Sequence, residues 1–369
     1  MAKTVLNKLL ALAVQNEASD IHLKVDGPAV FRVGNDLVDT SYVPDAATLQ
    51  KFFDQITQEE HRKKFHDVGD VDVSLLEDEV GRFRVNLHRQ RGTIAINLRH
   101  VKNVVRTFEE LGLPDTLGRI SETPRGIVFV TGTTGSGKST TLAAMMEYVN
   151  QRFRRHIITI EDPIEYEFKD NQSVFDQREV GIDTVSFASA LVHVLRQDPD
   201  IILVGEMRDR ASFEAALQAA DTGHLVLTTL HATNSTQSIT RILDFYQKDE
   251  QDSVREALAT NLAAIISQRL VPRAMGNGRV PAWEIMLNTP VISKLIQDNR
   301  LEKLPAAIMG GDSDGMASFN MSLLQLVNDG IITEEDALEA SDNPDSLRMN
   351  FEGIFLSADS GGIIGDRSI

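Results

Sequence analysis

The chain has 369 residues, 42% of them hydrophobic and 25% charged, which is enough for two domains of ordinary globular composition. It contains no cysteine, which excludes a disulfide framework and a cysteine-ligated zinc site. Its formal net charge of −17 argues against nucleic acid as a partner, because such binding depends on Lys and Arg contacts to phosphates.

The N-terminal segment is predicted to be an amphipathic helix rather than a secretion signal. Its apolar core, Leu9–Val14, is too short for a signal peptide, and Leu6, Leu9, Leu10 and Ala13 recur at the spacing of one helix face. No apolar run in the sequence approaches the length of a membrane span. These features predict a cytoplasmic protein.

A small α/β domain is predicted over residues 1–99. Short, β-rich apolar runs predict its strands, and the last two are expected to pair with each other. The following residues, 100–115, are predicted to be a linker. The predicted strands are 19–25, 31–33, 71–75, 81–87 and 93–98.

An α/β nucleotide-binding domain of the RecA-like type is predicted over residues 116–348. Apolar runs alternate there with helical segments, as expected for parallel strands buried on both faces of a sheet. From about residue 250 the pattern is predominantly helical, and the Gly- and Ser-rich residues 349–369 are predicted to form a flexible tail. The predicted strands are 126–130, 157–160, 201–204 and 225–230, and the later helices are 251–270, 290–298, 318–329 and 333–340.

The stretch TGTTGSGKSTT at 131–141 matches the phosphate-binding pattern G-x-x-x-x-G-K-[ST]. A predicted strand precedes it and a helical pattern follows it, which is the context that a P-loop requires and a merely flexible Gly/Ser/Thr loop does not. Lys138 would reach the β- and γ-phosphates, and Ser139 would hold Mg²⁺. The predicted nucleotide-binding residues are Gly132, Thr133, Thr134, Gly135, Ser136, Gly137, Lys138, Ser139 and Thr140.

Two acidic segments follow predicted strands and are candidates for catalysis. Glu206 follows strand 201–204, where it could order the attacking water, while Gly205 holds the position of the usual Walker-B aspartate. The alternative for Glu206 is a solvated surface glutamate. Glu161 and Asp162 follow strand 157–160 and would lie near Mg²⁺, unless they form only an acidic turn fixed by Pro163.

Histidine and arginine side chains complete the candidate site. His224 and His231 lie at the two ends of a predicted strand, and His231 could hydrogen-bond to the γ-phosphate, although a lone histidine is more often structural. Arg84 and Arg99 lie on the last two strands of the first domain, and both could be ordinary surface residues. If they serve the phosphates, we expect them to act in trans, as arginine fingers from a neighbouring subunit.

These segments, in this order, resemble the PilT/PilU branch of the type IV pilus and type II secretion ATPases. The P-loop alone is generic, but its combination with IEDPIEY, VGEMRD and TGHLVLTTLH is highly specific. The resemblance extends over nearly the whole chain. The further matching stretches are ASDIHL at 18–23, GRFRVN at 81–86, QREVG at 177–181, ISQRLVP at 266–272, LNTP at 287–290, GMASF at 315–319 and NPDSLR at 343–348.

The resemblance implies a homohexameric ring whose subunits pair a PAS-like N-terminal domain with a RecA-like ATPase domain. It assigns catalysis to Glu206, an acidic box to Glu161–Glu165, a histidine box to His224–His231, and trans arginines to Arg84 and Arg99. ATP and Mg²⁺ would be the cofactors. The ring would act on an inner-membrane pilus platform protein from the cytoplasmic face, driving pilus retraction, with a paralogous retraction ATPase as a candidate partner.

Three alternatives stay open. A secretion or pilus-assembly ATPase of this family would carry a longer N-terminus and a four-cysteine zinc insertion, and a RecA-like nucleic-acid motor is opposed by the net charge. A catalytically silent ring subunit would be expected to lack one of Lys138, Glu206, Arg84 or Arg99. Residues 291–298 depart from the AIRNLIRE-like segment of retraction members, which leaves a divergent or accessory retraction role open.

Overall fold

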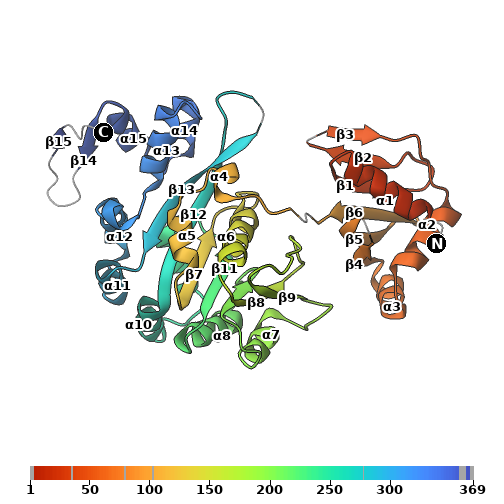
Figure 1. The fold of residues 1–369 in the computed structure, drawn as a ribbon, viewed down its shortest axis with the longest axis horizontal. Coiled ribbons are helices and arrows are strands. Elements are labelled where there is room, and N and C mark those ends of the chain that lie inside the picture. Colours follow the sequence, from red (N-terminus) through yellow and green to blue (C-terminus); the bar gives the residue numbers. More distant parts are fainter. Residues whose placement is uncertain are drawn as a thin grey trace. The chain divides into compact units, whose positions relative to one another are not determined.

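The computed structural model describes residues 4–34, 36–78, 80–101, 104–276, 278–356 and 363–365 (Figure 1). The chain divides into two units, one containing Met1–Val104 and Glu165–Glu167, the other Val105–Ile164 and Phe168–Ile369. Residues 102–103 of the predicted linker lie outside the described ranges. The boundaries 1–99, 100–115, 116–348 and 349–369 therefore stay predictions.

The first unit is a six-stranded antiparallel sheet with helices packed against it. Its described helices are α1 (Val5–Gln15), α2 (Ala46–Ile56) and α3 (Glu59–Val68), and its strands are β1 (Ala18–Leu23), β2 (Val30–Val33), β3 (Asp36–Asp39), β4 (Asp70–Glu77), β5 (Gly81–Gln90) and β6 (Thr93–His100). The strand order is β3-β2-β1-β6-β5-β4. Helix α1 packs on β1 and buries Leu6, Leu9, Leu10 and Ala13, so the predicted amphipathic helix is confirmed.

The second unit is built on a seven-stranded sheet with the order β13-β12-β7-β11-β10-β8-β9. Every neighbouring pair is parallel except β12 and β13. The four predicted central strands are confirmed. The strands are β7 (Gly126–Thr131), β8 (His156–Glu161), β9 (Val174–Glu179), β10 (Ile201–Val204), β11 (Leu225–Leu230), β12 (Leu262–Pro272) and β13 (Arg279–Leu287).

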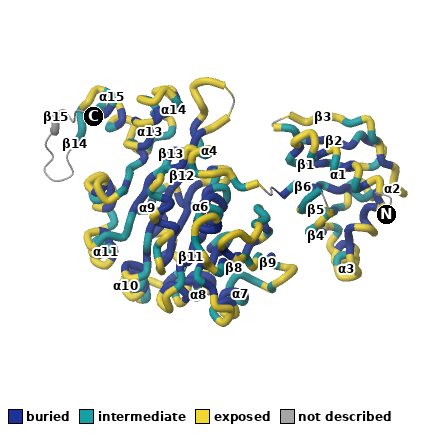
Figure 2. The backbone as a smooth tube through the Cα atoms, in the orientation of Figure 1, coloured by how far each residue is buried: buried dark blue, intermediate teal, exposed yellow. Residues whose placement is uncertain are grey.

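Helices cover both faces of this sheet, and Figure 2 shows the strands as buried beneath partly exposed helices. The described helices of this unit are α4 (Phe108–Leu111), α5 (Thr116–Ser121), α6 (Lys138–Arg152), α7 (Phe187–Val194), α8 (Arg210–Asp221), α9 (Ser235–Leu243), α10 (Gln251–Asn261), α11 (Pro290–Gln297), α12 (Leu304–Met309), α13 (Phe319–Asn328), α14 (Glu334–Ala340) and α15 (Pro344–Phe351). Among these helices, none has the length and apolar composition needed to cross a bilayer.

Alternate residues of β7 contribute to two separate apolar cores, because side chains along a strand point to opposite faces. Ile127 and Phe129 belong to one core with residues of α8, α9 and α10. Val128 and Val130 belong to the other core with residues of α6. Burial of each such side chain contributes about 1.5–3 kcal/mol, so β7 is held firmly from both sides immediately before the glycine-rich loop.

The predicted helix over 251–270 is wrong in its second half. Helix α10 ends at Asn261, and Leu262–Pro272 forms β12, which lies parallel to β7 and antiparallel to β13. The run LAAII is buried along most of its length, and periodicity cannot distinguish a strand buried on both faces from a buried helix. The later predicted helices are confirmed as α11, α13 and α14.

The C-terminal helices pack on the outer part of the same sheet. Side chains of α13, α14 and α15 form an apolar cluster with residues of β12 and β13. Helix α15 continues to Phe351, and β14 (Ile354–Leu356) pairs with β15 (Ile363–Gly365). Of the predicted flexible tail, 349–369, residues 357–362 and 366–369 lie outside the described ranges, and the flexibility of the tail stays a prediction.

Candidate active site

The carboxyl ends of four parallel strands bring the predicted site residues of the second unit to one edge of the sheet. The P-loop follows β7, Glu161 ends β8, Glu206 follows β10 and His231 follows β11. This edge is where open α/β sheets bind their ligands. His224 precedes β11 at the opposite edge, where its Nδ1 lies 2.9 Å from the carbonyl oxygen of Ala219.

The P-loop requires glycine at two positions for steric as well as conformational reasons. Gly132 and Gly137 adopt φ values of +152° and +90°. A Cβ added to Gly132 would lie 2.5 Å from the Gln268 carbonyl oxygen, and one added to Gly137 would lie 2.8 Å from Gln268 Nε2. Larger residues would therefore displace the loop from β12, and the loop's path depends on both glycines.

The loop offers unsatisfied donors that fit a phosphate group. The Ser136 hydroxyl is buried and has no hydrogen-bond partner among the described residues. Helix α6 begins directly after Gly137, and within the described chain no side chain caps its N-terminus. Backbone N–H groups at such a terminus bind anions, so these residues fit a nucleotide phosphate.

Lys138 lies within this cradle, while the crest of the loop is exposed. The Lys138 ammonium donates hydrogen bonds to the carbonyl oxygens of Gly132 at 2.9 Å and Thr133 at 3.0 Å. Ser139 and Thr140 are half-buried in the first turn of α6. Thr133, Thr134 and Gly135 are exposed at the crest.

Glu206 forms the centre of a polar cluster with Arg208 and His231. The Glu206 carboxylate accepts from Arg208 Nη2 at 2.6 Å and lies 3.2 Å from His231 Nε2. Its side chain retains 21% exposure, so it is held in place yet accessible to water. The hydrogen bond with Glu206 raises the pKa of Arg208. Arg208 was not predicted to be a site residue, although the matching stretch VGEMRD contains it. Its ion pair with Glu206 depends on the turn after β10.

Gly205, at the usual Walker-B position, is packed closely against β8. A Cβ at Gly205 would lie 3.3 Å from the Cα of Glu161 and 3.4 Å from the carbonyl oxygen of Ile160. The Gly205 N–H also donates to that carbonyl at 2.8 Å. The close approach of β8 therefore leaves little room for a side chain at position 205, and the acidic residue at this strand end is Glu206.

Glu161 is a buried carboxylate fixed by its own strand and the neighbouring one. It accepts from Thr159 Oγ1 at 2.6 Å and from Gln177 Nε2 at 3.3 Å. Glu179, which was not predicted, is also buried and accepts from the Ile164 N–H at 3.3 Å, which orders the segment after β8. Asp162 is exposed.

Arg84 and Arg99 lie opposite each other on β5 and β6 of the first unit, which confirms that these strands pair. Arg99 Nε donates to Asp20 Oδ1 at 2.7 Å. Burial would raise the pKa of Asp20, but hydrogen bonds from Arg99 and Ser19 outweigh it and lower that pKa. Arg84 is exposed and forms no hydrogen bond or ion pair with the described residues.

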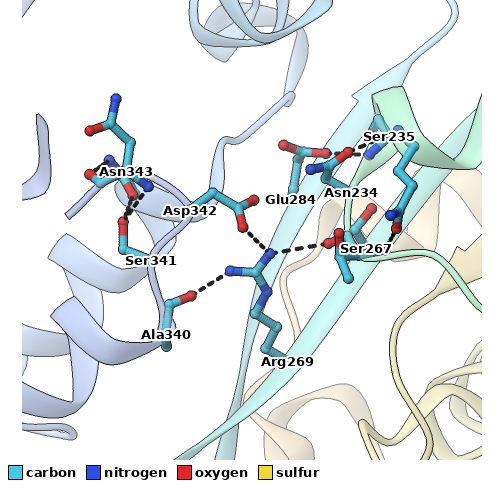
Figure 3. A network of polar contacts seen from close by, with 12 residues as sticks. Asn234, Ser235, Ser267, Arg269, Glu284, Ala340, Ser341, Asp342 and Asn343 are labelled. Atoms are coloured by element: carbon cyan, nitrogen blue, oxygen red, sulfur yellow. Dashed lines mark hydrogen bonds and ion pairs between the residues drawn. The ribbon is translucent and has the colours of Figure 1, made fainter.

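A polar network around Arg269 connects the segment after β11 to the C-terminal helices (Figure 3). The Arg269 guanidinium donates to the carbonyl oxygen of Thr233 at 3.2 Å and forms an ion pair with Asp342. It also stacks on Phe319, 4.0 Å from the ring centroid. The backbone N–H of Ser235 donates to Glu284 Oε1 at 2.7 Å. These contacts fix the segment that follows His231.

Glu284 makes the stability of this network dependent on pH. Burial raises its pKa, hydrogen bonds from Ser235 only partly offset this, and the nearby Asp342 carboxylate adds to the rise. The stabilising effect of protonated Glu284 is complete below the unfolded-state pKa of about 4.3 and is lost as the pH rises through the folded-state pKa.

Glu284→Gln is therefore expected to stabilise the protein at neutral pH, by about 1.4 kcal/mol for each unit by which the native pKa is raised. Glutamine keeps the acceptor for Ser235 without the buried charge. Chemical denaturation at several pH values between about pH 4 and neutral pH measures the free energy of unfolding over the range in which the Glu284 carboxyl is expected to ionise. Glu256→Gln, an exposed change on α10, is the matched control. If Glu284→Gln and the wild type show the same change in unfolding free energy between acid and neutral pH, the prediction is contradicted.

Comparison with known proteins agrees with this geometry. The family model of the type II/IV secretion system protein matches residues 1–308. The chain is 42% identical to the type IV pilus retraction ATPase PilT of Pseudomonas aeruginosa, covering 93% of this chain and 99% of that protein. It is 38% identical to the type IV pilus ATPase PilU of the same organism, covering 93% of this chain and 90% of that protein.

Among solved structures, the pilus retraction motor PilT with bound ADP superposes with a TM-score of 0.87 at 42% identity, covering 94% of this chain and 99% of that one. The P-loop edge, the Glu206 cluster and these similarities agree with one another. The chain therefore belongs to the type II/IV secretion system protein family.

Proposed function

We propose that this chain is the subunit of a hexameric ATPase that drives type IV pilus retraction. The observation that carries this proposal is the single sheet edge that holds a phosphate cradle, Glu206 and His231 together. A domain that only binds nucleotide would not need an accessible carboxylate held in place at the same sheet edge as the cradle. The similarity to PilT over nearly the full length of both chains supports pilus retraction as the work performed.

In the proposed reaction, the P-loop holds the phosphates of ATP between Lys138 and the N-terminus of α6. Ser139 would hold Mg²⁺, with Glu161 as the candidate carboxylate near it, and the bound ion would neutralise charge on the phosphates. Glu206 orients the water that attacks the γ-phosphate, and its contacts with Arg208 and His231 keep the carboxylate in place. His231 contacts the Glu206 carboxylate and is proposed to sense the γ-phosphate at the same sheet edge.

Positive charge on the transition state is proposed to come from Arg84 and Arg99 of a neighbouring subunit. Asp20 would orient Arg99, while Arg84 is free to engage a phosphate oxygen. Nucleotide turnover would then loosen and remake contacts around the ring. We place the ring in the cytoplasm, on an inner-membrane platform protein, with a paralogous retraction ATPase as a candidate partner and no nucleic-acid substrate.

Deletion of the gene, with imaging of labelled pili, tests the function. Cells are expected to remain piliated and to lose retraction, and a plasmid copy should restore it. The Glu206→Gln copy should not. Loss of pili would indicate an assembly motor instead, and loss of secreted proteins with normal retraction would indicate a secretion motor. Retraction that persists at reduced force would indicate an accessory role.

A further inference from the structure

Strand β12 lies directly beside the P-loop, although it is far from the loop in sequence. Ser267 pairs with Thr131, the last residue of β7, so Gln268 is the first residue of β12 beyond the end of that strand. Its side chain is buried, with 3% exposure. A buried amide is stable only when its donors and acceptors are satisfied, and the partners of Gln268 lie in and after the loop.

The amide of Gln268 joins the last residues of the loop to the first turn of α6. Its Nε2 donates to the carbonyl oxygen of Ser136 at 2.8 Å. Its Oε1 accepts from the Thr141 hydroxyl at 2.6 Å. One side chain thus acts as donor on one side and acceptor on the other, which neither a carboxylate nor an apolar residue can do.

The bond to Ser136 also orients a phosphate-binding donor. In a planar trans peptide, the C=O of one residue and the N–H of the next point in opposite directions. Because the Ser136 carbonyl points toward Gln268, the N–H of Gly137 points away from β12. Gln268 also lies against both loop glycines, its carbonyl oxygen near Gly132 and its Nε2 near Gly137. Its position therefore determines the shape of the cradle.

We propose that Gln268 is a positioning residue for nucleotide binding, which sets the P-loop conformation through its bonds to Ser136 and Thr141. This inference rests on the proposed ATPase function and deepens it. We assign Gln268 no direct contact with phosphate, because both ends of its amide are bonded to Ser136 and Thr141. Its loss is expected to weaken nucleotide affinity by misorienting the loop, and to raise KM for ATP more than it lowers kcat.

The test is equilibrium binding of ADP to the purified full-length protein. Gln268→Leu is expected to weaken ADP binding by about tenfold or more, because two buried hydrogen bonds are lost next to the loop. Gln268→Glu, which loses only the donor, should show a similar loss. Thr141→Val should weaken binding, and Thr141→Ser should recover most of the wild-type affinity. The Gln268→Leu and Thr141→Val effects should be less than additive, since they remove a shared bond.

Asn150→Ala is the matched control. Asn150 is also a buried bridging amide, donating to the Lys169 carbonyl at 2.9 Å and accepting from the Asn171 N–H at 3.2 Å, but it lies near the far end of α6. It should change the melting temperature without changing ADP affinity. ADP binding at wild-type affinity by Gln268→Leu, or equal loss in Asn150→Ala, would overturn the inference. A wild-type protein that binds ADP but does not hydrolyse ATP would instead overturn the proposed function.

Discussion

Replacement of Glu206 by glutamine is expected to reduce ATP turnover by about two orders of magnitude or more while ATP binding persists. Glutamine has the same shape and keeps an oxygen for Arg208 or His231, but it lacks the negative charge that orients and polarises water. The carboxylate lies outside the P-loop, so the phosphate contacts stay intact. Phosphate release measures turnover, and a fluorescent ATP analogue measures binding.

Two further variants show whether the loss of turnover is specific to the Glu206 carboxylate. Lys138→Ala should weaken nucleotide binding itself, because this ammonium lies within the cradle. Glu214→Gln is the matched control, since Glu214 is an exposed carboxylate that also accepts from an arginine, Arg210, at 2.8 Å. It should leave turnover unchanged. Turnover of Glu206→Gln within a few-fold of wild type would reject the catalytic role.

Arg84→Ala is expected to abolish most ATP turnover, because the proposed transition state loses a positive charge supplied by a neighbouring subunit. Mixing Arg84→Ala subunits with Glu206→Gln subunits should restore part of the activity. Each mixed ring would contain some interfaces at which an intact Arg84 meets an intact Glu206. Phosphate release from co-assembled subunits, compared with each variant alone, is the measurement.

Arg84 is the cleaner of the two arginines to test. Arg99→Ala would leave the Asp20 carboxylate without its ion-pair partner, which would reduce the free energy of unfolding by about 1–3 kcal/mol. The mixing experiment could not separate this loss of stability from a loss of catalysis. Arg89→Ala, an exposed change on the same strand, is the control for Arg84. Two controls must succeed first: the two variants must be shown to co-assemble, and rings that contain some wild-type subunits must hydrolyse ATP. If the mixed rings then show no more turnover than each variant alone, the arginines act within their own subunit or only structurally.

The sequence predicted those elements whose signal lies within a short stretch of residues. Strands β7, β8, β10 and β11 have apolar runs because they are buried on both faces, and the P-loop glycines follow from the backbone conformation that the loop needs. The first helix followed from its single apolar face. Strand β12 was missed because it follows α10 directly, with no Gly or Pro between them, so its apolar run was taken as a continuation of that helix.

The candidate site was predictable as a set of residues but not as a set of contacts. Glu206 and His231 were identified from their positions after two strands, yet their 3.2 Å separation depends on the parallel pairing of β10 and β11. Arg208 and Gln268 lie within the matching stretches VGEMRD and ISQRLVP, but neither was predicted to be a site residue. Gln268 acts 132 positions away from Ser136, and no short-range pattern encodes such a contact.

The placement of β12 also determines when this nucleotide site can form during synthesis. The ribosome makes β7 and the P-loop long before it makes Leu262–Pro272, which completes the sheet on the other side of β7. Until then β7 has an unpaired edge, which invites association with other chains. The loop also lacks the strand that its glycines pack against. Nascent chains that end before β12 are therefore expected to depend on chaperones, and nucleotide cannot assist their folding until β12 has emerged.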